Sequence, residues 1–303
     1  MVAILASIPS PSSGSLDLGP FSIHLYGVTL LVAIVLCTLI TGRRWVARGG
    51  DWDLILRCAV WGVAAGIVGA RLYHLATSWD EVPDEWWGPF AIWKGGLGIW
   101  GGILAGSIVG AIIARRAGAD VWLLADTVAP GLLVAQAVGR LGNWWNQELF
   151  GKPSDLPWAL EIDPENRPVA TIADPTYHPT FLYELLWNLA VAAFLVYVLE
   201  RRFRPRPPGV FAAYVALYSF GRFWIELLRV DPAHEIAGVR LNAWVAAAVF
   251  VAGVVWYVRS QRHGGGGRGR RVRLPRPKRP RRRPKPAKRP AMTVPKGRVR
   301  PGR

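Results

Sequence analysis

The stretch FSIHLYGVTLLVAIVLCTLIT, residues 21–41, contains no Asp, Glu, Lys or Arg. A helix needs about 20 mostly apolar residues to cross a hydrocarbon layer of about 30 Å, so this stretch is long enough for one membrane span. Six further runs are predominantly apolar and of similar length. The predicted spans cover residues 21–41, 54–76, 95–114, 121–139, 180–200, 209–228 and 241–258. The sequence therefore predicts an all-α integral membrane protein with about seven transmembrane helices.

The composition agrees with a membrane location. Hydrophobic residues make up 51% of the chain, and it contains 16 Trp, which is too apolar and too rich in Trp for an ordinary soluble domain. The run GGLGIWGGILAGSIVG (95–110) would let two membrane helices approach closely. Many Trp residues fall near the ends of the predicted spans, as expected for anchors at the membrane interface.

The net charge of +17 is concentrated in the C-terminal tail. Of the 37 Lys and Arg residues, 19 lie from Arg259 onward, where Asp and Glu are absent, so residues 1–258 are close to neutral. We therefore divide the chain into an outer N-terminal segment (1–20), a membrane catalytic domain (21–258) and a basic tail (259–303). The tail is expected to be disordered and cytoplasmic, and to be attracted to anionic lipid headgroups.

Charges in the loops predict the orientation. Lys and Arg follow the first, third and fifth spans and fill the tail, whereas the opposite loops carry acids. Because short cytoplasmic loops are enriched in Lys and Arg, the N-terminus is expected outside and the C-terminus in the cytoplasm. The longest outer loop, 140–179, contains short β-like stretches such as PWALEI and is expected to form a small ordered cap between the fourth and fifth helices.

Cys37 and Cys58 both fall in apolar runs and are expected to be buried free thiols. Cys and His residues are not spaced as metal ligands. The sequence thus suggests no metal site and no cofactor.

Ionisable side chains cluster near the outer ends of the predicted helices. Such residues are costly within a membrane and usually have a partner or a function. They are His24 with Tyr26, Arg71, Arg140, His178 with Glu184, and Arg222 with Glu226 and Arg229.

In the sixth span, Tyr218, Arg222 and Glu226 follow one another at four-residue spacing and share a helical face. They could form a salt-bridge ladder that only holds helices together. Alternatively, the arginines bind an anion, since a guanidinium donates two parallel hydrogen bonds to a phosphate. The stretch GRLGNWWNQELFG (139–151) adds a second possible headgroup site, or a capped structural loop. It contributes Arg140, Asn143, Asn146, Gln147, Glu148 and Gly151.

Six motifs occur in an order that resembles the prolipoprotein diacylglyceryl transferases over about residues 20–258. They are HLYG (24–27), GAR (69–71), GGLGIWGG (95–102), GRLGNWWNQELFG (139–151), HPTFLYE (178–184) and YSFGRFWIELLR (218–229). The resemblance implies an enzyme of the bacterial cytoplasmic membrane. It would transfer a diacylglyceryl group from phosphatidylglycerol to the lipobox cysteine thiol of a prolipoprotein signal peptide, forming a thioether and releasing glycerol phosphate.

By the same resemblance, the functional positions are Tyr26, Arg140, Asn143, Glu148, Gly151, Tyr218, Arg222 and Arg229. Arg140 and Arg222 would hold the donor phosphate and stabilise its negative charge as it leaves. Position 100 departs from the family, because Trp100 replaces a histidine that many members carry and that has been treated as a possible base. We keep His24 and His178 as catalytic candidates, and Asn146, Glu226 and Arg71 as substrate-binding candidates.

Two other classes of function fit part of the pattern. A transporter or flippase for an anionic lipid or solute could use basic residues at helix ends, but should also carry polar groups near the membrane midplane. A structural anchor with a nucleic-acid-binding tail would not need Arg140 or Arg222. Specific nucleic-acid binding is not expected, because the tail lacks interleaved aromatic residues for base stacking.

Overall fold

The computed structural model describes residues 7–19 and 21–262. Among these residues, seven helices are long and apolar enough to cross a membrane, which confirms the predicted fold. The predicted tail beyond Arg262 lies outside the described residues. The helices are α1 (Leu25–Ala47), α2 (Trp52–Thr77), α3 (Ile99–Arg116), α4 (Val121–Trp145), α5 (Thr180–Ala193) with its π-helical continuation (Phe194–Phe203), α6 (Gly209–Leu228) and α7 (Leu241–Arg262).

Several helix boundaries differ from those predicted, and three of the differences concern the capped end. The first span begins at Leu25, because residues before it form strand β2 (Phe21–His24), which pairs antiparallel with β1 (Ser15–Leu18). Helix α3 begins only at Ile99, since Gly95 and Gly96 have positive φ angles. Helix α4 continues to Trp145, where Leu141 and Trp144 pack beneath the cap. Part of the 139–151 motif is therefore helical rather than loop.

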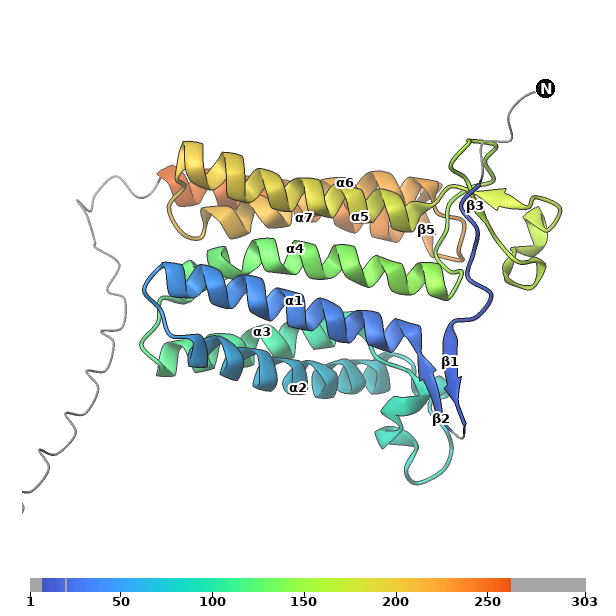
Figure 1. Cartoon of the computed structure of the whole chain (residues 1–303), viewed down its shortest axis with the longest axis horizontal. Coiled ribbons are helices and arrows are strands. Elements are labelled where there is room, and N and C mark those ends of the chain that lie inside the picture. The colour runs from blue at the N-terminus through green and yellow to red at the C-terminus, as the bar shows by residue number, and fades with distance from the viewer. Residues whose placement is uncertain (1–6, 20, 263–303) are drawn as a thin grey trace, which may run out of the picture.

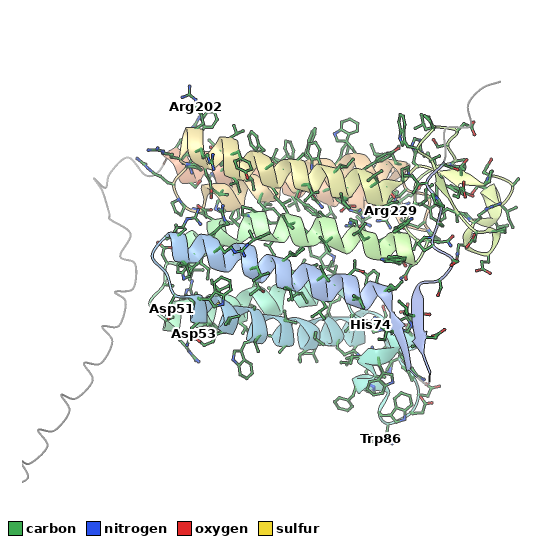
Figure 2. All side chains as sticks on the ribbon, in the orientation of Figure 1. Asp51, Asp53, His74, Trp86, Arg202 and Arg229 are labelled. Atoms are coloured by element: carbon green, nitrogen blue, oxygen red, sulfur yellow. The ribbon has the colours of Figure 1, made fainter. Side chains whose placement is uncertain are left out.

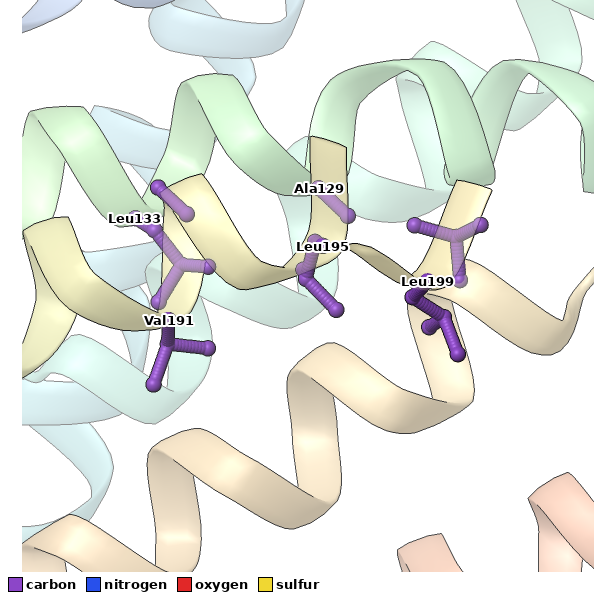
Figure 3. Close-up of a cluster of buried hydrophobic side chains, with 7 residues drawn as sticks. Ala129, Leu133, Val191, Leu195 and Leu199 are labelled. Atoms are coloured by element: carbon purple, nitrogen blue, oxygen red, sulfur yellow. The ribbon is translucent and has the colours of Figure 1, made fainter. Parts of the chain in front are cut away.

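Helices α1 and α4 pack together in the middle of the bundle, between the α2–α3 pair and a group formed by α5, α6 and α7 (Figure 1). Small residues bring α2 and α3 together: a Cβ atom added at Gly69 would lie 2.5 Å from the carbonyl oxygen of Gly101. A buried apolar cluster joins α4 to the α5 segment (Figure 3). Its labelled members are Ala129, Leu133, Val191, Leu195 and Leu199.

Short hairpins gather at one end of the bundle (Figure 1). The cap between α4 and α5 contains β3 (Leu160–Glu161) paired antiparallel with β4 (Thr176–Tyr177), which agrees with the predicted β-like stretches. A third hairpin, β5 (Glu235–Ile236) with β6 (Val239–Arg240), joins α6 to α7.

The other end of the bundle carries many of the basic residues. Figure 2 shows Arg202 there, far from Arg229 at the cap end. Glu200 lies 2.6 Å from Arg44 and 2.8 Å from Arg48, which ties the π-helical segment to α1. Both cysteines of the described chain are free.

Candidate functional site

Two of the predicted phosphate-binding arginines share one carboxylate. Arg140 of α4 forms an ion pair through Nη2 with Oε1 of Glu184 in α5. The other oxygen of this carboxylate, Oε2, lies 3.3 Å from Nη1 of Arg222 in α6. Glu184 is buried, with only 3% of its surface exposed. Three helices thus hold two guanidinium groups on a single anionic group.

Further polar contacts fix the position of Arg140. Its guanidinium is hydrogen-bonded to the hydroxyl of Tyr218 and donates through Nη1 to Oδ1 of Asn143 at 3.2 Å. The amide of Asn143 in turn donates to Oε1 of Glu148 at 2.8 Å. Because α4 extends to Trp145, Arg140 and Asn143 lie on consecutive turns of one helix, which brings these groups together.

Tyr26 approaches the same part of α4. A Cβ atom added at Gly142 would lie 2.4 Å from the ring of Tyr26, so only glycine allows this close contact. Tyr26 also interacts electrostatically with Glu148 and Arg140. The tyrosine predicted from the HLYG motif therefore borders the arginine cluster.

Glu226 forms the centre of a second, adjoining network. It is fully buried, and its carboxylate lies 2.5 Å from Nη2 of Arg222, 3.7 Å from Nη1 of Arg229 and 2.8 Å from Nε of Arg240. Asp231 pairs with Arg229 at 2.6 Å and with Arg240 at 2.9 Å. Burial acts to raise the pKa of Asp231, but hydrogen bonds and charge from the two arginines hold its pKa below the ordinary value.

Sequence reasoning did not place Asp231 or Arg240 at the site, and it named Glu184 without giving it a role. Arg240 stands out only as an arginine in an outer connection that also carries acids. Its partners lie far enough along the chain that no local spacing rule links them. Even so, only 8% of the Arg240 surface is exposed, and its guanidinium donates hydrogen bonds to both Glu226 and Asp231.

The arginine cluster is closed. Within the described residues, the surrounding side chains leave no water-sized cavity among Arg140, Asn143, Glu184, Arg222 and Arg229. Arg140 and Arg222 nevertheless keep 21% and 19% of their side-chain surface exposed, so an anion can approach them from outside, whereas a place between them requires these side chains to move.

A polar cavity of about 470 Å³ lies beside the end of α4. Glu148, Asn146 and Gln147 line one part of it, and residues 11–14 and the cap line the rest. Asn146 therefore faces this outer cavity, whereas Asn143 faces the arginine cluster. Since Glu148 is bonded to Asn143, the two sites are neighbours.

Arg71 lies in a different environment. Its guanidinium donates to the backbone carbonyls of Gly88, Pro89, Gly95 and Gly96 at 2.6 to 3.0 Å, which orders the connection between α2 and α3. The tip of this connection carries Trp86, which is 85% exposed and projects sideways from the bundle (Figure 2). Arg71 is not among the residues that line the arginine cluster, and its predicted contact with substrate stays a prediction.

Gly151 joins the cap to the end of α6. Its N–H donates to the carbonyl of His178 at 2.9 Å, and it forms an isolated bridge with Arg229. A Cβ atom at Gly151 would lie 2.8 Å from Cβ of His178. The close approach of the two backbones explains why glycine occupies this position.

The two candidate histidines are not part of the arginine cluster. His24 is exposed at the residue before α1. His178 lies just before α5, with Nδ1 3.1 Å from the hydroxyl of Tyr183. Neither is among the residues that line the cluster. Trp100, at the position where relatives often carry histidine, is 56% exposed.

Seven membrane-length helices and a half-buried arginine cluster at the capped end define a multi-pass membrane protein with a site suited to an anionic group. Residues 14–259 match the family model described as prolipoprotein diacylglyceryl transferase. The chain belongs to this family, and it is a transferase.

Curated relatives agree with this assignment. A protein of Frankia alni is 50% identical over 262 residues, covering 83% of this chain and 67% of the relative. Relatives from Cutibacterium acnes and Streptomyces griseus are each 47% identical, covering 86% and 85% of this chain and 89% and 79% of their own lengths. All three are named phosphatidylglycerol–prolipoprotein diacylglyceryl transferase. The family membership favours the enzyme over a transporter or a structural anchor.

Proposed function

We propose that this protein transfers the diacylglyceryl group of phosphatidylglycerol to the thiol of a lipobox cysteine in a prolipoprotein signal peptide. The observation that carries the proposal is the arrangement of Arg140 and Arg222 on the two oxygens of Glu184. Two guanidinium forks that converge on one carboxylate are already aligned to bind a phosphodiester, which also presents two anionic oxygens.

Binding of the lipid is an exchange of anions. The phosphodiester takes the place of the Glu184 carboxylate between the two arginines, because the cluster leaves no space for both. Asn143 and Tyr218, which are bonded to Arg140, keep its guanidinium oriented during the exchange. Tyr26 borders the same position and is available to bond the phosphate or the glyceryl group.

In the transfer step, the cysteine sulfur attacks the glyceryl carbon that carries the phosphate. A C–S bond forms, the C–O bond to the phosphate breaks, and its electron pair leaves on the phosphate oxygen as glycerol phosphate. Arg140 and Arg222 stabilise the leaving anion. A free cysteine is already a few per cent thiolate near neutral pH, and the positive field of the arginines favours further loss of the thiol proton.

The capped end, with the arginine cluster, faces the outside of the bacterial cytoplasmic membrane. The opposite end carries Arg43, Arg115, Arg201 and other basic residues, as cytoplasmic loops do. The N-terminus is then outside and the C-terminus cytoplasmic. The basic residues of the tail are attracted to the anionic inner leaflet.

The direct test is transfer in vitro. Purified protein in liposomes is given phosphatidylglycerol labelled in its acyl chains, together with a lipobox peptide or the same peptide with cysteine replaced by serine. Label on the cysteine peptide alone, with equimolar release of glycerol phosphate, is expected. Failure to label the cysteine peptide, with the protein folded and inserted, would overturn the proposal.

A further inference from the structure

A second polar layer lies one helical turn deeper than the arginine cluster. In α4, Gln136 precedes Arg140 by four residues, and in α6, Tyr214 precedes Tyr218 by four residues. Gln136 donates to the hydroxyl of Tyr214 at 3.0 Å, just as Arg140 bonds to Tyr218 in the layer above. Four residues of helix correspond to about 6 Å along the helix axis.

Asn188 of α5 belongs to the same deeper level. It follows Glu184 by four residues and therefore lies on the same face of α5. Helices α4 and α6 run toward the cap, whereas α5 runs away from it. Asn188, four residues after Glu184, is therefore farther from the cap, as are Gln136 and Tyr214, which come four residues before Arg140 and Tyr218. Below this level, Leu133 and Val191 belong to the buried apolar cluster.

Asn188 differs from the other buried polar residues of the described chain because both atoms of its amide lack a hydrogen-bond partner. The residue has no exposed surface, and within the described residues neither Oδ1 nor Nδ2 has a hydrogen-bond partner. Oε1 of Gln136 is likewise buried without a partner there. Native proteins satisfy the large majority of such groups, because leaving one unsatisfied costs free energy. These atoms therefore point to a ligand with hydrogen-bonding groups.

We propose that this layer, with Asn188 Nδ2 as donor, binds an ester carbonyl of the lipid donor. The inference rests on the proposed function. In a diacyl phospholipid, the order from headgroup to tails is charged phosphate, neutral esters and apolar chains. The protein presents arginines, then Gln136 and Asn188 amides, then the apolar side chains of Leu133 and Val191, in the same order and direction.

Displacement of the Glu184 carboxylate would also let the lipid reach this deeper layer. Glu184 lies one turn above Asn188 on α5, and its ion pair with Arg140 joins α5 to α4 at that level. When the phosphate displaces the Glu184 carboxylate, the next turn of α5 becomes accessible to the glyceryl esters. One displacement therefore opens both subsites.

The test compares two donor lipids in the full-length enzyme. Phosphatidylglycerol with ester-linked chains and its dialkyl ether analogue differ only in the carbonyl groups. We measure kcat/KM for each with wild type, Asn188→Leu and Asn188→Ala. The matched control is Thr41→Val, which removes another buried polar group, one that lies against Gly131 on α4 and away from this layer.

Wild type and Thr41→Val should prefer the ester lipid by about tenfold, the effect of one hydrogen bond. Both Asn188 variants should lower this preference to about one, with no loss of thermal stability in Asn188→Leu, since an apolar side chain then replaces an unsatisfied amide. An ester preference that is unchanged in both Asn188 variants would overturn the subsite and indicate a structural water instead. Absence of wild-type transfer from both lipids would overturn the proposed function and this subsite with it.

Discussion

Glu184 places one oxygen of its buried carboxylate on the guanidinium of Arg140 and so joins α5 to α4 at the level of the site. The same carboxylate reaches Arg222 of α6 through its other oxygen. A buried arginine that lost its partner would be strongly destabilising, so this carboxylate keeps the site stable before a lipid arrives. It must also compete with the lipid phosphate for the same donors.

We predict that Glu184→Gln lowers KM for phosphatidylglycerol several-fold. The amide keeps the shape of the side chain and an oxygen that can accept from Arg140, so the protein should fold with lower thermal stability, but it removes the negative charge that competes with the phosphate. The matched control is Glu200→Gln, because Glu200 also pairs with two arginines, Arg44 and Arg48, but at the opposite end of the bundle. KM should be unchanged in the control. A raised KM in Glu184→Gln would mean that the carboxylate serves to position the arginines rather than to compete with the lipid.

Arg140→Lys and Arg222→Lys should each lose roughly 100-fold or more in kcat/KM. Lysine retains the positive charge but not the two-pronged fork, and loss of one donor to a developing anion typically costs about 10²–10³-fold. Circular dichroism and membrane insertion should remain as in wild type. Arg57→Lys, which changes an exposed arginine paired with Asp53 on α2, is the control and should be fully active. Near-normal transfer in both site variants would reduce these arginines to helix-pairing residues.

Much of this architecture could be predicted from the sequence because the membrane imposes a simple rule. A span must be apolar and about 20 residues long, and all seven predicted spans correspond to observed helices. The errors fall at helix ends, where the rule gives no information. Glycine with positive φ delays the start of α3 at Gly95 and Gly96, and packing beneath the cap extends α4 through Asn143.

The site was only partly predictable, because side-chain partners on different helices are set by packing. The i,i+4 rule identified Arg222 with Glu226 on one helix. It could not show that Glu184 bridges Arg140 and Arg222, or that Arg240 reaches Glu226 from the α6–α7 connection. The sequence likewise contained no sign that Arg71 would donate to four backbone carbonyls, and its predicted contact with substrate stays a prediction.

The orientation can be tested with single cysteines. In a variant without Cys37 and Cys58, cysteine replaces either Asp163 in the cap or Arg204 at the opposite end. A membrane-impermeant thiol reagent applied to intact cells should label position 163, whereas position 204 should be labelled only after lysis. Asp163 is exposed, so access does not limit the result. The reverse pattern would place the arginine cluster on the cytoplasmic side.

Removal of the basic tail should leave transfer largely intact. A chain that ends after His263 retains every residue of the arginine cluster and all seven helices. We expect kcat/KM within about twofold of wild type in liposomes, because electrostatic attraction of the tail to lipid headgroups adds membrane affinity but no contact with the reacting atoms. An inactive truncated protein that is correctly inserted would make the tail part of the catalytic unit.

The last prediction concerns activation of the cysteine thiol. Trp100 cannot accept a proton, and neither His24 nor His178 lines the arginine cluster. An unperturbed thiol has a pKa near 8.5, and nearby arginines favour its thiolate. We therefore expect departure of the phosphate, not deprotonation by a histidine, to limit the rate. His24→Asn and His178→Asn, singly and together, should retain measurable transfer.

The measurement is the initial transfer rate against pH for wild type, the histidine variants and Arg222→Lys. All histidine variants should follow the wild-type profile, with a rate that rises with pH as the thiol ionises and levels off above the thiol pKa. Arg222→Lys should be far slower at every pH, because the leaving phosphate is stabilised less whatever the ionisation of the thiol. Suppose instead that one histidine variant were inactive at neutral pH and recovered only at high pH, while Arg222→Lys stayed active. That histidine would then be the base, because hydroxide would be replacing its function, and activation by the arginine field would be wrong.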